Sequence, residues 1–109
     1  MIKELTPDII NLRNNLVELS DDMKVIDELS NKVTLMIISF VTGYLGTNYT
    51  KDTNTSKIKD EVVLKLTDMV VSELDLSCHK TNQVIEILER TYKTMSISIN
   101  VYLMENKIF

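Results

Sequence analysis

The residues best suited to chemistry are a cysteine and a histidine that are adjacent in the sequence. Cys78 and His79 are each the sole residue of their type among the 109 residues. A cysteine nucleophile needs a histidine within hydrogen-bonding distance, whereas neighbouring residues of a helix point about 100° apart. A structural zinc site needs four ligands. We therefore predict no catalytic dyad, no metal site and no cofactor.

Two pairs of acidic residues are spaced three apart, which places both carboxylates of a pair on one helix face. These pairs are Glu18 with Asp21 and Glu86 with Glu89. Such carboxylates can hold magnesium in helical enzymes that hydrolyse nucleotides, but acids at this spacing are also typical of a solvated face. The sequence has no glycine-rich phosphate loop, dinucleotide-binding turn or His-Glu-x-x-His motif. We predict that the protein is not an enzyme, with a nucleotide hydrolase as the alternative.

Apolar residues three and four apart predict two helices in the first half of the chain. The first is expected over 7–19, because Thr6-Pro7-Asp8 combines a capping hydroxyl, a proline in the first turn and an acid near the helix N-terminus. The second is expected over 21–45, with Ser20-Asp21-Asp22 as a cap whose acids lie in the opening turn. The predicted core residues are Leu5, Ile9, Leu12, Leu16 and Leu19 in the first helix and Ile26, Leu29, Val33, Met36, Phe40 and Tyr44 in the second.

A Thr/Asn-rich loop over 46–56 separates these helices from two more. The third is expected from about residue 55 to 74, and a long fourth helix follows a connection at 77–81. Residues 96–103 also fit an edge strand, because apolar residues alternate there, but a lone strand is not stable and we favour a helix. The sequence predicts an all-α, four-helix, antiparallel bundle that forms a single domain over 1–109. The predicted core residues are Ile58, Val62, Leu66, Met69, Val70 and Leu74 in the third helix and Val84, Ile85, Leu88, Tyr92, Met95, Ile99, Tyr102 and Leu103 in the fourth.

The second and fourth predicted helices carry more apolar residues than one core-facing stripe requires. A central helix covered by the others could bury the extra residues of the second helix, whereas an exposed apolar row along the fourth is typical of a contact surface. We predict that these extra residues form an interface with a second copy, most simply in a homodimer, or with another protein. The predicted interface residues are Leu35, Ile38 and Leu45 in the second helix and Ile97, Val101, Met104 and Ile108 in the fourth.

Composition restricts the partners and the compartment. A net charge of −4 and dispersed lysines disfavour nucleic acids. The uncharged run 33–50 reaches the lower length limit of a membrane span, but its second half is polar, so membrane association through residues 33–46 is a second alternative to the bundle. A single cysteine and an N-terminus without a signal-peptide pattern indicate a cytoplasmic protein.

These patterns predict a non-enzymatic helical protein that acts by protein–protein interaction. We expect self-association together with a host or cellular protein partner, and acidic surface residues that attract basic partners. The absence of alanine and the abundance of isoleucine, lysine and asparagine indicate AT-rich coding. This bias is typical of a viral, phage or plasmid-borne protein, and such a protein could modulate a host pathway.

Overall fold

The computed structural model describes residues 5–47 and 55–105, with the side chains of 43–47, 55–58 and 103 left out. Four long helices make up most of the described chain: α1 (Thr6–Val17), α2 (Met23–Thr47), α3 (Thr55–Glu73) and α4 (Thr81–Glu105). A short 3₁₀ turn, η2 (Cys78–Lys80), precedes α4. Helices with no strand in these ranges confirm the predicted all-α four-helix bundle.

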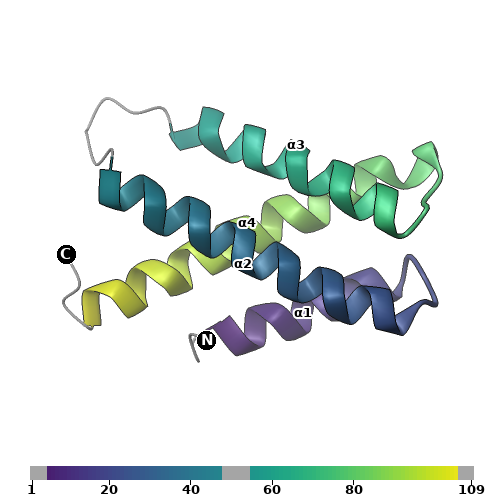
Figure 1. The fold of residues 1–109 in the computed structure, drawn as a ribbon, viewed down its shortest axis with the longest axis horizontal. Helices are drawn as coiled ribbons and strands as arrows, with labels where there is room; N and C mark the ends of the chain where they lie inside the picture. Colours follow the sequence, from purple (N-terminus) through teal and green to yellow (C-terminus); the bar gives the residue numbers. More distant parts are fainter. Residues whose placement is uncertain (1–4, 48–54, 106–109) are drawn as a thin grey trace.

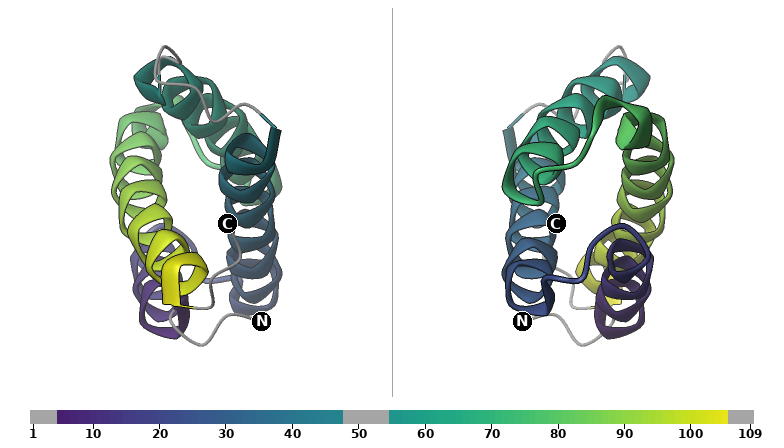
Figure 2. Two further views of the ribbon diagram at one scale, coloured as in Figure 1. Left: turned by 90° about the vertical axis from the view of Figure 1, so that its left-hand side faces the viewer. Right: turned by 90° about the vertical axis from the view of Figure 1, so that its right-hand side faces the viewer.

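Successive helices run in opposite directions, as Figure 1 shows. Helices α2 and α4 cross and contact each other, and each also contacts both α1 and α3. Within the described ranges α1 and α3 do not contact each other. Figure 2 shows α2 and α4 on opposite sides of the bundle, and α1 and α3 each contact both of them.

The start of α1 differs from the prediction. We expected the Thr6 hydroxyl to cap the helix, but Thr6 is already its first helical residue and Leu5 occupies the cap position with φ −86° and ψ −10°. No side chain caps this end. Leu5 is fully buried in the core, and its near-helical backbone extends the first turn toward the N-terminus. The predicted threonine cap is therefore wrong, because burial of Leu5 outweighs the capping preference of Thr6.

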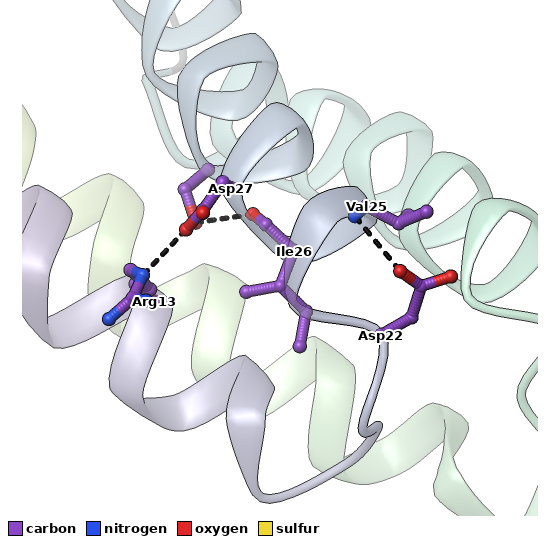
Figure 3. A network of polar contacts seen from close by, with 6 residues as sticks. Arg13, Asp22, Val25, Ile26 and Asp27 are labelled. Atoms are coloured by element: carbon purple, nitrogen blue, oxygen red, sulfur yellow. Dashed lines mark hydrogen bonds and ion pairs between the residues drawn. The ribbon is translucent and has the colours of Figure 1, made fainter.

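Helix α2 begins at Met23, two residues later than predicted and directly after the predicted capping segment 20–22. The backbone N–H of Val25 donates to Oδ1 of Asp22 at 3.3 Å, and the N–H of Asp22 donates to Oγ of Ser20 at 3.2 Å. Figure 3 shows the Asp22 carboxylate turned toward the first turn of the helix. This bond satisfies one of the free amide groups of a helix N-terminus, so Asp22 fixes where α2 begins.

Much of the core comes from the predicted apolar stripes, but the buried Ile37, Val41, Val63 and Ile87 were not predicted. The side chains of the predicted Tyr44, Ile58 and Leu103 lie outside the described residues. In α1 and α4, Leu12, Leu16, Leu88, Met95 and Ile99 are all inaccessible to solvent. Residues 96–103 continue α4 without interruption, which confirms the helical alternative for this segment. The buried residues with large side chains include Leu5, Leu12, Leu16, Ile26, Leu29, Val33, Ile37, Val62, Leu66, Val70, Val84, Leu88, Met95 and Ile99.

Among the described residues, four serine and threonine side chains are buried in this core and bonded within their own helices, whereas the buried Oγ of Ser96 has no hydrogen-bond partner. Ser30, Thr34, Thr67 and Thr91 donate to the carbonyl oxygen four residues earlier, at 2.7 to 2.9 Å. A buried hydroxyl without a partner destabilises the folded state, and a bond to the preceding turn removes that cost without a contact to a second helix. Apolar contacts therefore remain the main interaction between the helices.

Polar contacts at the edge of the core fix the relative orientation of neighbouring helices. Nε of Arg13 in α1 donates to Oδ1 of Asp27 in α2 at 2.6 Å, as drawn in Figure 3. Between α2 and α3, Nζ of Lys32 donates to Oε1 of Glu73 at 2.8 Å. The side chains of both pairs are partly exposed, so each pair orients its helices more than it stabilises them.

Candidate interaction surface

The residue types that could do chemistry are exposed on the surface. Cys78 and His79 are exposed in η2, and Glu86 and Glu89 are exposed on α4. Within residues 5–47 and 55–105, no three acidic, histidine or cysteine side chains come close enough to hold a metal ion. In the same ranges no helix combines the length and hydropathy that a membrane crossing requires.

Helix α4 carries an exposed row of apolar side chains near its C-terminal end, which we call the α4 stripe. It consists of Ile97, Val101 and Met104, whose exposed fractions are 57%, 43% and 67%. Steps of four and three residues place these side chains on one face of the helix. Ile97 is two residues from both Met95 and Ile99, which are fully buried, so it points away from the core. This end of α4 is therefore apolar on two opposite sides.

The remainder of this α4 face is charged. Glu86, Arg90 and Lys93 continue the line of Ile97 toward the helix N-terminus, and all three are exposed. The first part of α4 thus has the ordinary amphipathic pattern, with a buried apolar face and a solvated outer face. The outer face changes from charged to apolar at Ile97, so amphipathic packing within the bundle does not account for the α4 stripe.

A contact between helices holds the α4 stripe in place. Oγ of Ser98, next to Ile97, donates to Oδ2 of Asp8 in α1 at 2.8 Å. Together with the buried Met95 and Ile99, this bond ties the C-terminal part of α4 to the bundle. The exposed side chains therefore stand on a supported helix, which lowers the conformational entropy lost when a partner binds.

The predicted residues of α2 lie on a different side of the molecule. Leu35 is 55% exposed and lies between the buried Val33 and Ile37, so it points away from the core, and Ile38 beside it is half-buried. Leu35 thus lies on the outer side of α2 and the α4 stripe on the outer side of α4, two helices that Figure 2 shows on opposite sides of the bundle. The structure therefore does not bring the two predicted sets together. The side chain of Leu45 and all of Ile108 lie outside the described residues.

Other exposed apolar residues were not predicted from the sequence. Leu64 on α3 is 57% exposed, and Ile10 and Val17 are exposed on α1. The seven-residue spacing of Ile10 and Val17, on the side of α1 away from Leu12, is the pattern that could have identified them. Single exposed apolar side chains are common on protein surfaces. Within the described residues, α4 is the one helix with three large exposed apolar side chains on the same face.

No model of a known protein family, no curated protein and no solved structure matches this chain. The surface chemistry of the described residues therefore provides the basis for a proposed function.

Proposed function

We propose that this protein has no enzymatic activity and acts by stoichiometric protein–protein contact, in which it self-associates through the α4 stripe. The observation that carries the proposal is the 43% to 67% exposure of Ile97, Val101 and Met104 on one supported helix face. Exposed apolar residues grouped on one face characterise interaction sites, because removing them from water favours association.

The second part of the proposal concerns a different protein in the cell of origin or in a host. Its support is Leu35, which is 55% exposed on α2, because Figure 2 shows α2 on the opposite side of the bundle from α4 and a partner on the α4 stripe would leave α2 uncovered. A net charge of −4 favours encounter with basic partners. The AT-rich coding bias supports a viral, phage or plasmid-borne role inside a cell.

Measuring the mass of the protein in solution tests the self-association. We expect a concentration-dependent dimer by light scattering, and Ile97→Asp or Met104→Asp should weaken it on the order of 100-fold, because each places a charge in an apolar contact. The matched control is Leu64→Asp, since Leu64 on α3 has the same 57% exposed fraction as Ile97. All variants should keep the far-UV circular dichroism of the wild type. An unchanged mass for Ile97→Asp would contradict the proposal.

A further inference from the structure

Charged side chains of opposite sign flank the α4 stripe. Arg90 and Lys93 are exposed on its N-terminal side, and Glu105 is exposed at its C-terminal end. Along the outer face of α4 the order is therefore basic, apolar, acidic. Lys93 and Glu105 are twelve residues apart, or about 18 Å along a helix.

This order is self-complementary when two α4 helices meet in opposite directions. Ile97 and Val101 are each two residues from Ile99, and Lys93 and Glu105 are each six residues from it. A two-fold axis at the level of Ile99 would place Ile97 opposite Val101 of the partner subunit and Lys93 at the level of Glu105 of the partner subunit. Glu86 is seven residues from Lys93, about 10 Å further along the helix, so it does not oppose that glutamate.

We propose that the occupant of the α4 stripe is α4 of a second copy of this chain, packed antiparallel about a two-fold axis at the level of Ile99. This inference rests on the proposed function and specifies its partner and geometry. The apolar residues form the centre of the contact, and Arg90 and Lys93 pair with Glu105 of the partner subunit at both ends. A two-fold interface must complement itself, and the antiparallel arrangement meets this requirement. A parallel arrangement would bring like charges together at each end.

Charge reversal tests the direction of the two helices. Sedimentation equilibrium would compare the dimer dissociation constants of wild type, Glu105→Lys, the double variant Arg90→Glu/Lys93→Glu, and the triple variant that combines all three changes. We expect the single and the double variant to dimerise on the order of tenfold more weakly, because attractive contacts become repulsive at both ends. The triple variant should regain wild-type affinity, because every pair again has opposite charges.

Mixing the two weakened variants provides a second readout. Glu105→Lys and Arg90→Glu/Lys93→Glu should form a heterodimer with an affinity near that of the wild type, because both ends then pair opposite charges. Glu61→Lys is the control for Glu105→Lys, since it makes the same charge change at an exposed position of α3 and should leave the dimer unchanged.

The outcomes separate this inference from the proposed function. Suppose that Ile97→Asp abolishes the dimer. If charge reversal then has no effect, or if the triple variant does not regain wild-type affinity, the antiparallel arrangement is wrong. Self-association through the α4 stripe still stands in both cases. If the wild type is a monomer at every concentration measured, both are wrong. Recovery by the triple variant and heterodimer formation would support the arrangement.

Discussion

One carboxylate determines where α2 starts. Asp22 accepts the Val25 N–H, whereas at the start of α1 the hydroxyl predicted to cap the helix does not do so. The sequence contains both capping patterns, and only the structure distinguishes them. The reason is tertiary, since the helical turn at Leu5 forms because that side chain is buried among residues distant in sequence. Local capping rules contain no information about such burial.

Replacement of Asp22 tests the cap directly. Asp22→Ala should lower the free energy of unfolding by about 1 kcal/mol, the usual contribution of an N-cap residue. Asp21→Ala, which removes the same charge from the neighbouring exposed position, is the control and should cost less. Urea denaturation monitored by circular dichroism measures both values. Equal losses would show that the Asp22 side chain does not act as a cap.

Buried leucines provide the second test at this scale. Leu12 and Leu88 have no solvent exposure, so Leu12→Asp or Leu88→Asp would place an unpaired charge in the core and should unfold the protein. The milder Leu88→Ala should cost about 2–5 kcal/mol. Leu35→Ala is the control, because Leu35 is largely exposed, and its effect should stay within about 0.5 kcal/mol. Retained helicity and cooperative unfolding of Leu88→Asp would contradict this core.

The helices themselves were the most predictable level of the structure. Apolar periodicity placed four helices within a few residues of their observed bounds, and it identified the buried face of α4 through Leu88, Met95 and Ile99. It did not separate helix from edge strand over residues 96–103, where the structure shows a helix. Periodicity describes one helix at a time, however. It could not predict contacts between helices such as Ser98 with Asp8 or Lys32 with Glu73.

The Lys32–Glu73 contact between α2 and α3 gives a pH-dependent prediction. The hydrogen bond to Glu73 and the charge of that carboxylate raise the pKa of Lys32 above its ordinary value of 10.5. Because the folded state then holds this proton more tightly than the unfolded state, the pair stabilises the fold fully below pH 10.5. That contribution is lost as the pH rises through the raised pKa.

Comparison of wild type with Lys32→Met measures this contribution. The difference in their free energies of unfolding should shrink as the pH is raised past 10.5. Lys24→Met, at an exposed position in the first turn of α2, is the control, and its difference from wild type should change less. A Lys32→Met difference that stays constant across this range would contradict a role for the ion pair.

At the scale of the whole molecule, the packing of α2 against α4 determines which apolar residues outside the core stay exposed. The sequence identified extra apolar residues on both helices but could not show that α2, with the exposed Leu35, and α4, with the α4 stripe, lie on opposite sides of the bundle. That relation depends on how the helices are arranged around each other, and apolar spacing along one helix does not encode it. The residues of the candidate site could therefore be chosen from the sequence, whereas their division into two surfaces is visible only in the structure.

The central claim is that the α4 stripe is covered by a partner surface when the protein self-associates. Methionine methyl resonances report this in the unmodified protein, since Met104 lies in the stripe and Met23, at the start of α2, is exposed away from it. We predict that the Met104 methyl resonance shifts with protein concentration along a dimerisation curve while that of Met23 stays constant. A Met104 resonance that does not move over the concentration range in which mass is measured would contradict the account.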